Sequence, residues 1–190
     1  MMSSDCWLNI RYGFPQGKLS KEDSFSKVLG QKSLMNKAKK TDNDVLLVKS
    51  EPIVIERYAK ISAVDYSTLY GHKVTLVGFG LMDKKPEGLQ MAIFTANPLQ
   101  VWDSAMVRKC DDLTQYPSIC VVPECGKWNS IFNGDSGGPV LHPSGVIGVI
   151  SRYVMSRIIS RTLTADIIIP VSPYIDWMSS VINKDRSKQI

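Results

Sequence analysis

The sequence predicts a mostly β domain that ends in one helix, and three observations carry this prediction. Short apolar runs of strand length recur along the chain. Clusters of glycine, proline and serine separate them, as turns do between strands. The apolar spacing changes to the helical period only near the end. With 190 residues and 44% hydrophobic residues, the chain is long enough for one domain or two small lobes with a buried core.

The strands are expected where the apolar runs lie. A weak first strand is expected at Trp7–Arg11. The others are expected at 44–49, 74–79, 88–96, 118–122, 139–142, 145–151 and 166–171. Short strands at this spacing are typical of an all-β barrel or sandwich.

The last segment has the signals of an amphipathic helix over 172–183. Ser172 is a good N-cap, and Pro173 suits the first helical position. An apolar face then follows at helical spacing, formed by Tyr174, Trp177, Met178, Val181 and Ile182. We expect this face to pack on β structure, so its aromatic residues are interpreted as core and not as a binding site.

The positive charge of the chain is concentrated at its beginning. Residues 1–40 carry eight basic and three acidic side chains, a difference that equals the net charge of +5 of the whole chain. We interpret residues 1–40 as a basic, poorly defined segment. Basic segments can bind polyanions, but no nucleic-acid-binding motif accompanies this one, and no nucleic-acid partner is expected. No apolar run reaches membrane-spanning length, and the first residues are too polar to open a signal peptide.

Four cysteines allow three pairings. Cys110 and Cys120 close a short loop, and Cys6 and Cys125 remain. A secreted domain would use such residues in disulfides, whereas a cytosolic protein would keep them reduced. Their spacing does not suggest a zinc site, and neither a metal nor a cofactor is expected.

The most informative stretch is Asn133–Pro139, with the sequence NGDSGGP. A serine hydroxyl becomes a useful nucleophile only beside a base and a group that stabilises an oxyanion. The glycines around Ser136 permit unusual backbone angles, and the N–H groups of Gly134 and Ser136 can converge on one oxyanion. A bare G-x-S-x-G would leave a simple glycine-rich turn as an equal interpretation, but the full run favours the chemical one.

The same residues also fit the G-x-S-x-G elbow of α/β-hydrolases, in which a helix follows the serine. Here Gly137, Gly138 and Pro139 follow, and they open a helix poorly. The one later histidine, His142, lies too close in sequence to reach back to Ser136. The context therefore argues against the elbow.

Asn133–Pro139 resembles the nucleophile loop of the chymotrypsin/trypsin family of serine proteases. Further segments resemble this family in its own order, over residues 41–183. They are Asn43–Lys49, Gly78–Gly80, Gly148–Ser151 and Val171–Trp177. The resemblance implies a chymotrypsin-like double β-barrel over residues 41–190, with an incomplete N-terminal barrel, a complete second barrel and the terminal helix.

The resemblance also implies a role for each matching residue. Ser136 would be the nucleophile, and Asp44 the buried acid that orients the base. Gly134 and Ser136 would supply the oxyanion hole. Asp135 would be the carboxylate that pairs, in active members, with the amine freed by zymogen cleavage. No such cleavage site occurs here, which leaves Asp135 without its usual partner.

The family's cysteine and pocket positions can be carried over in the same way. Cys110–Cys120 falls where the family has a small-loop disulfide, and Val74 and His142 fall at two positions that are commonly bridged to each other. The substrate pocket would be formed by Ser130, Ser151, Tyr153 and Asp166. Tyr153 stands where the family has glycine and should narrow the pocket entrance, while Asp166 stands on a wall and could attract a basic side chain.

The departures from the family concern the base. The family places its histidine well upstream of the aspartate, but no histidine precedes His72 here. His72 and His142 lie in loop-like contexts and are not expected to act as the base. The first strands of the first barrel are missing as well.

Two functions therefore remain open. The first is a serine endopeptidase that forms an acyl-enzyme on Ser136, with its histidine and signal peptide encoded upstream. The second is a non-catalytic homologue that binds protein partners. The resemblance implies a protein or peptide as substrate or partner and an extracellular location. The chain as written is expected to be inactive, because proton transfer from Ser136 needs a base within reach.

Overall fold

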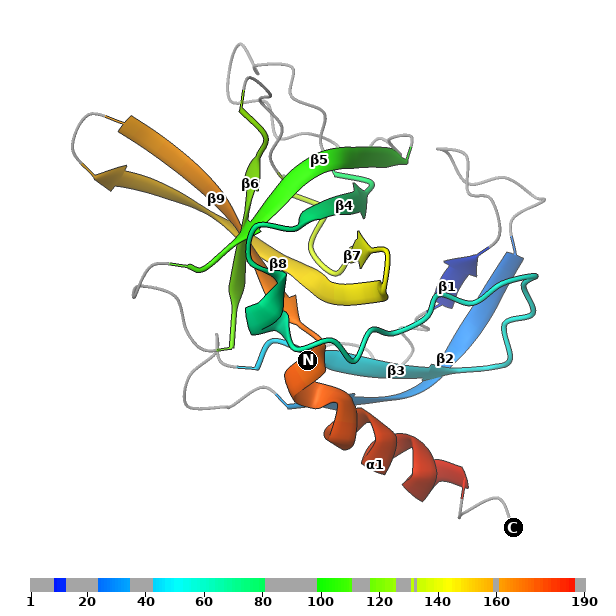
Figure 1. Cartoon of the computed structure of the whole chain (residues 1–190). Helices are drawn as coiled ribbons and strands as arrows, with labels where there is room; N and C mark the ends of the chain where they lie inside the picture. Colours follow the sequence, from blue (N-terminus) through cyan, green and yellow to red (C-terminus); the bar gives the residue numbers. More distant parts are fainter. Residues whose placement is uncertain are drawn as a thin grey trace, which may run out of the picture.

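The protein contains two β units and a C-terminal helix (Figure 1). The computed structural model describes residues 9–12, 24–34, 43–80, 99–110, 117–125, 131, 133–158 and 161–186. The strand expected at 88–96 lies outside these residues. The arrangement is mostly β with one C-terminal helix, as the sequence predicted.

The first β unit is a three-stranded antiparallel sheet of β1 (Asn9–Tyr12), β2 (Ser24–Ser33) and β3 (Leu46–Ser50). The first half of β2 pairs with β1, and its second half pairs with β3. The sequence did not predict β2. Its apolar residues Phe25 and Leu29 stay about half exposed, at 49% and 54%, so the strand has no buried apolar face from which the sequence could predict it. Backbone pairing to both neighbours defines it instead.

The second β unit is a closed six-stranded barrel. Its strands are β4 (Lys73–Gly78), β5 (Gln100–Arg108), β6 (Ile119–Pro123), β7 (Pro139–His142), β8 (Gly145–Ile158) and β9 (Arg161–Pro170). Neighbouring strands are antiparallel in the order β4-β5-β6-β9-β8-β7. The register Thr75↔Leu141 places Val74 next to His142 across β4 and β7, as expected for family positions that are commonly bridged.

The hydrophobic core fills the barrel. It includes Leu69, Val74, Leu76, Val107, Ile119, Val121, Ile131, Val140, Ile147, Ile150 and Ile168. β4 alternates between buried and less buried positions with the period of a half-buried strand, which is why the sequence predicted it. β5 has buried residues only at Ala105 and Val107 among more polar neighbours, and the sequence gave no comparable signal for it. Each fully buried aliphatic side chain stabilises the fold by roughly 1.5–3 kcal/mol.

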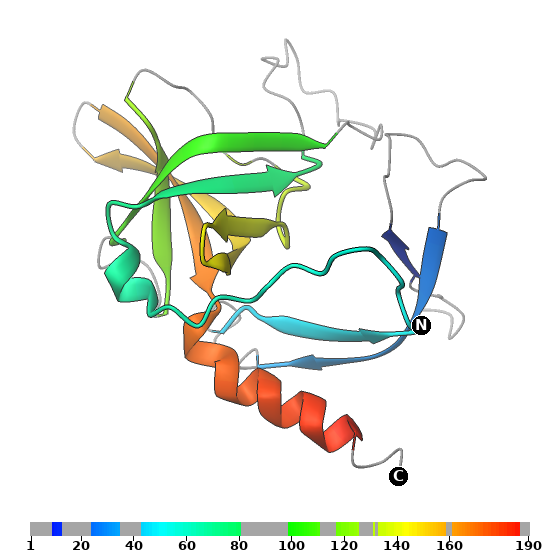
Figure 2. The same cartoon turned by 45° about the vertical axis from the view of Figure 1, so that its right-hand side comes forward.

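A long connector, residues 51–65, joins the end of β3 to a short 3-10 helix, η1 (Tyr66–Leu69), at the barrel (Figure 2). The connector pairs with the start of β8 through a parallel bridge between Ile61 and Val146. Ser62 N–H donates to the Val146 carbonyl at 2.9 Å, and Val146 N–H donates to the Lys60 carbonyl at 2.8 Å. The connector is thus docked on the beginning of β8.

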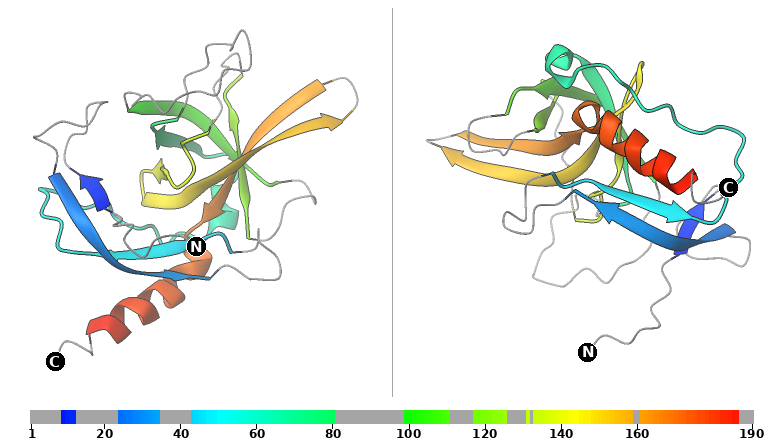
Figure 3. Two further views of the ribbon diagram at one scale, coloured as in Figure 1. Left: turned by 180° about the vertical axis from the view of Figure 1, so that it is seen from behind. Right: turned by 90° about the horizontal axis from the view of Figure 1, so that it is seen from below.

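The chain ends in η2 (Ser172–Tyr174) and α1 (Ile175–Arg186), which extends away from the barrel below the first sheet (Figures 1 and 3). Tyr174 is buried, whereas Ile182 on the predicted apolar face is 49% exposed. The N-cap prediction for Ser172 is wrong. Its hydroxyl accepts a hydrogen bond from Tyr66 N–H at 3.2 Å and so ties the helix start to η1. Among the described residues, no helix is long and apolar enough to cross a membrane.

Candidate functional site

The loop that carries Ser136 is pinned to strand β8. Gly137 N–H donates to the Ile150 carbonyl at 2.8 Å, and Ile150 N–H donates to the Gly138 carbonyl at 2.9 Å. Gly137 has φ of 90°, in the left-handed region that glycine adopts without strain. The loop is thereby held open as a sharp turn, and Ser136 at its tip is exposed.

The Ser136 hydroxyl has a defined partner. Its Oγ donates a hydrogen bond of 3.0 Å to the main-chain carbonyl of Ser151 on β8. A hydroxyl that donates to a carbonyl keeps its proton, because a carbonyl oxygen is far too weak a base to accept it. The Ser136 hydroxyl is therefore held by the Ser151 carbonyl and stays exposed.

Ser151 also contacts the predicted acid. Its Oγ donates to Asp44 Oδ2 at 2.9 Å, across 107 residues of sequence. Asp44 lies just before β3, in the first β unit, while Ser136 and Ser151 belong to the barrel. Ser151 thus brings the two residues together, binding Ser136 with its carbonyl and Asp44 with its side chain. The site lies where the two β units meet.

Asn43 and Tyr174 position the acid, and sequence reasoning missed both. Asn43 has φ of 56°, the one positive φ at a residue other than glycine in the described part of the chain. Its side-chain oxygen accepts a hydrogen bond of 3.1 Å from the phenol of Tyr174. Asparagine tolerates the left-handed region better than most residues. The Asn residue before Asp44 was therefore the sequence signal for an unusual backbone conformation at this position. The start of the terminal helix therefore fixes the backbone that carries Asp44.

Asp135 is buried, with 2% of its surface exposed, and its carboxylate lies against the turn Gly78–Gly80. Oδ1 accepts a hydrogen bond of 2.6 Å from Gly80 N–H. A Cβ atom at Gly78 would lie 2.0 Å from Oδ1, and one at Gly80 would lie 2.4 Å from Oδ2. Both glycines are needed for this close approach. The backbone of the turn therefore provides a contact for the carboxylate that the sequence left without its usual partner.

The backbone donors next to Ser136 are available. Gly134 has φ of 106°, and its Cα position packs against Gly80, to which an added Cβ would come within 3.2 Å. Within the described part of the chain, no hydrogen bond engages the N–H groups of Gly134 and Ser136. The role of these two groups as an oxyanion hole stays a prediction.

The predicted pocket residues are only partly described. Asp166 on β9 is buried, with 4% exposed, and its Oδ2 accepts a hydrogen bond of 3.2 Å from Ile131 N–H. Tyr153 pairs with Asp166 in the β8–β9 register, but its side chain lies outside the described residues, as does Ser130. Asp166 therefore supports the backbone that leads into the nucleophile loop.

Neither histidine is bonded to Ser136, Ser151 or Asp44. His72 Nδ1 and His142 Nε2 lie 3.2 Å apart and contact each other. His142 lies at the end of β7, and its Nδ1 is engaged by Ser144. The hydrogen bonds of both rings therefore lie outside the site.

The disulfide prediction is confirmed. Cys110 and Cys120 are bridged, with their Cα atoms 4.9 Å apart, and both are buried beside Ile167. Cys125 is a free, exposed thiol, and Cys6 lies outside the described residues. No group of three or more potential metal-ligating side chains occurs among the residues that the structure describes.

The barrel with its second sheet, the terminal helix and the glycine-flanked serine define a chymotrypsin-like fold. The sequence profile of the trypsin family matches residues 9–178, most of the chain. The chain therefore belongs to the trypsin family and forms a trypsin-like serine protease domain. No curated protein matches the sequence.

Proposed function

We propose that Ser136 and Asp44 are the nucleophile and the acid of a serine endopeptidase site, and that the 190-residue chain alone does not hydrolyse peptide bonds. The observation that carries this proposal is the pair of hydrogen bonds made by Ser151. Its main-chain carbonyl accepts from Ser136 Oγ at 3.0 Å, and its Oγ donates to Asp44 Oδ2 at 2.9 Å. Those contacts keep the acid and the nucleophile at one place although they come from different β units.

The backbone of the Ser136 loop provides the groups that would stabilise the oxyanion. The N–H groups of Gly134 and Ser136, which make no hydrogen bond among the described residues, suit the oxyanion that forms when a serine attacks a carbonyl. The contact between Asp135 and Gly80 supports the same loop from beneath. In this proposal, attack by Ser136 Oγ forms an acyl-enzyme, and water then releases the acyl group.

The absence of activity follows from proton transfer. When Ser136 attacks a carbonyl, a base must take its proton, and the group that its hydroxyl contacts is a main-chain carbonyl. Both histidines of the sequence are bonded elsewhere. In a serine protease of unrelated fold that uses the same chemistry, loss of the base lowers turnover by about 10⁶-fold. The chain alone should therefore show no measurable turnover.

A fluorophosphonate probe tests the proposal. The purified 190-residue chain should not be labelled at Ser136, with Ser136→Ala as the background control. Added imidazole, a diffusible base, should restore slow labelling if acid and nucleophile are correctly placed. That rescue should weaken in Asp44→Ala, because the acid orients the base. Labelling without imidazole that disappears in Ser136→Ala would contradict the inactivity, and no rescue at any imidazole concentration would contradict the assignment of the site.

A second candidate, a non-catalytic module that binds proteins, is favoured by one specific observation. The Ser136 hydroxyl already donates to the Ser151 carbonyl, a stable arrangement that needs no histidine. In a binding module this hydrogen bond would be permanent, whereas in an enzyme it would have to break before Ser136 attacks a substrate. The imidazole experiment separates the two candidates, since a remodelled site has no reason to respond to an added base.

The substrate or partner in either case is a protein or peptide, which fits the trypsin family. An extracellular location is part of the proposal. The buried Cys110–Cys120 disulfide supports it, because such bridges persist in oxidising compartments.

A further inference from the structure

The two histidines of the sequence meet at one place on the barrel. His72 precedes β4 and His142 ends β7, and 70 residues separate them in sequence. Their ring centroids are 5.3 Å apart, with an angle of 46° between the planes, and Nδ1 of His72 lies 3.2 Å from Nε2 of His142. The rings are not stacked, so a hydrogen bond between these two nitrogens defines the contact.

The contact continues into the connector through two serines. His142 Nδ1 lies 2.9 Å from Ser144 Oγ, which lies 2.8 Å from Ser62 Oγ. Ser62 is a connector residue with 1% of its surface exposed. Its Oγ accepts a hydrogen bond of 3.2 Å from Val64 N–H. A continuous chain of hydrogen bonds thus runs from the connector, through the β7–β8 turn, to the start of β4.

The donors and acceptors in this chain can be assigned. Ser144 N–H donates to His142 Nδ1 at 3.2 Å, so Nδ1 is an acceptor and carries no proton. The proton of neutral His142 is therefore on Nε2, from which it donates to His72 Nδ1. Ser62 then donates to Ser144, and Ser144 donates to His142. Every hydroxyl donates once and accepts once, but only while the imidazole of His142 is neutral.

From this arrangement we propose that His72, His142, Ser144 and Ser62 form an acid-released latch, which holds the connector on the β7–β8 turn at neutral pH. The connector is the covalent link between β3, the strand that follows Asp44, and the barrel that carries Ser136. Release of the latch therefore loosens the link between the two halves of the candidate site.

Protonation of His142 removes one of these hydrogen bonds and reverses another. A proton on His142 Nδ1 faces the Ser144 N–H group, which is itself a donor, so that bond is lost. The Ser144 hydroxyl then has to accept from Nδ1 and can no longer donate to it, which disturbs its contact with Ser62. Burial, and then the charge of His72, lower the pKa of His142 below its ordinary value. The folded state thus binds a proton at His142 less readily than the unfolded state does.

The sign of the pH effect follows from this direction. Because the pKa of His142 is lowered on folding, the stabilisation is fully present above about pH 6.5, the ordinary pKa of histidine. It is lost as the pH falls below that value towards the lowered pKa. The latch is therefore closed at pH 7.5 and opens in mildly acidic solution.

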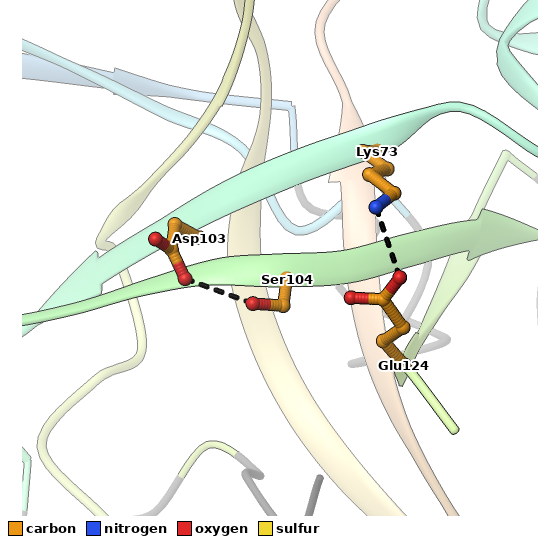
Figure 4. A network of polar contacts seen from close by, with 4 residues as sticks. All are labelled: Lys73, Asp103, Ser104 and Glu124. Atoms are coloured by element: carbon orange, nitrogen blue, oxygen red, sulfur yellow. Dashed lines mark hydrogen bonds and ion pairs between the residues drawn. The ribbon is translucent and has the colours of Figure 1, made fainter. Parts of the chain in front are cut away.

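Two other titratable groups close in sequence to the latch, Lys73 and Asp65, have partners of their own. Lys73, next to His72, binds Glu124 Oε1 at 2.9 Å across the barrel wall, close to the exposed pair Asp103 and Ser104 (Figure 4). The hydrogen bond to Glu124 raises the pKa of Lys73. On the connector side, the Asp65 carboxylate accepts from Ser67 N–H, which lowers its pKa. Lys60, also on the connector, contributes its main-chain carbonyl to Val146.

A shared metal ion is a weaker explanation for the histidine pair. His142 directs an N–H group towards His72, and a metal would require that proton to move to Nδ1, which already accepts from Ser144 N–H. The described residues offer no third side-chain ligand near the pair.

Hydrogen exchange at pH 5.5 and 7.5 tests the latch, after correction for the intrinsic pH dependence of exchange. The amides of Ser62, Val64 and Ser144 should exchange up to about tenfold faster at pH 5.5, because one proton shifts an opening equilibrium by no more than tenfold for each pH unit below the ordinary pKa. The amides of the barrel core, such as Val107, should not change. Equal corrected rates at both pH values would overturn the proposal.

His142→Asn is the most informative variant. Its side-chain oxygen can accept from Ser144 N–H in an Asx turn, and it does not titrate. The connector should therefore stay protected at pH 5.5 in His142→Asn. Acid release equal to that of wild type in this variant would overturn the proposal. Lys73→Gln, which changes the neighbouring charge, is the matched control and should keep the acid response.

A measurement on the unmodified chain tests the same assignment if the variant does not fold. The ¹⁵N chemical shifts of the imidazoles report which ring nitrogen carries the proton. At pH 7.5, His142 should be protonated at Nε2 and bare at Nδ1. A proton on Nδ1 at that pH would contradict the assigned chain of donors and the latch with it.

Discussion

The phenol of Tyr174 donates a hydrogen bond of 3.1 Å to the side-chain oxygen of Asn43, across 131 residues of sequence. Tyr174 is buried where the terminal helix begins, and Asn43 precedes the predicted acid, Asp44. The end of the chain thus determines where Asp44 lies, although neither residue of the pair takes part in the proposed chemistry.

Substitutions at Asn43 should separate the two roles of this residue. Asn43→Gly removes the acceptor for Tyr174 but keeps a residue that adopts φ of 56° without strain. Asn43→Ala removes the acceptor and adds a strained left-handed alanine. The alanine variant should therefore be less stable than the glycine variant by about 1 kcal/mol, measured by urea unfolding. Equal stabilities would show that backbone strain at Asn43 does not matter.

The close contact between the Asp135 carboxylate and the Gly78–Gly80 turn should leave no room for a side chain at Gly80. In Gly80→Ala the new Cβ would lie 2.4 Å from Asp135 Oδ2 and displace a buried carboxylate. We expect a loss of about 3 kcal/mol in the free energy of unfolding. Gly30→Ala is the matched control, because nothing lies within 4 Å of its added Cβ and its backbone is not left-handed. That control should stay within about 1 kcal/mol of wild type, and a similar loss in both variants would contradict the close contact.

A double-mutant cycle should detect the bond between Ser151 and Asp44. Ser151→Ala and Asp44→Ala each remove one partner of a 2.9 Å hydrogen bond at a half-buried site. The coupling free energy should be about 1–2 kcal/mol in chemical denaturation, as is typical of a hydrogen bond to a charged group. The exposed bond between Ser104 and Asp103, at 2.8 Å, is the control and should give less than about 0.5 kcal/mol. Equal coupling in the two pairs would argue against a special role for Ser151.

Removing the Cys110–Cys120 disulfide should destabilise the barrel. The bridge closes a loop with a sequence separation of 10, and chain entropy predicts a stabilisation of about 2.5 kcal/mol for that length. The double variant Cys110→Ala, Cys120→Ala should show this loss in thermal or chemical unfolding. Cys125→Ser, at the exposed free thiol, should leave stability unchanged. Peptide mapping under non-reducing conditions that finds either cysteine bridged elsewhere would contradict the pairing.

Sequence patterns predicted the barrel strands whose burial alternates or whose apolar runs are continuous, such as β4, β7 and the start of β8. They missed β2, which has no buried apolar face, and β5, whose two buried residues Ala105 and Val107 lie among more polar neighbours. The terminal helix was predicted, but Ser172 bonds to η1 instead of capping it, since a tertiary contact outweighs a local one.

The same division holds for the site. Ser136 and Asp44 were proposed as site residues because their sequence contexts resemble those of a known family in the same order. The contacts of Asn43, Gly80 and His142 could not be found, because each partner lies 55 or more residues away in sequence. Local patterns encode elements, whereas these contacts arise only when the two β units and the helix come together.

The hydrophobic core indicates which part of the molecule unfolds first. Within the described residues, no member of its hydrophobic clusters comes from β1, β2 or β3. A sheet that adds so little to the core can detach while the barrel persists as a separate cooperative unit. Limited proteolysis should therefore cut first within residues 9–60 and leave a resistant fragment that contains the disulfide. Such a fragment would retain Ser136 but lose Asp44. Cleavage in the first sheet or the connector would therefore separate the two residues while β8, which binds Ser136, stays folded.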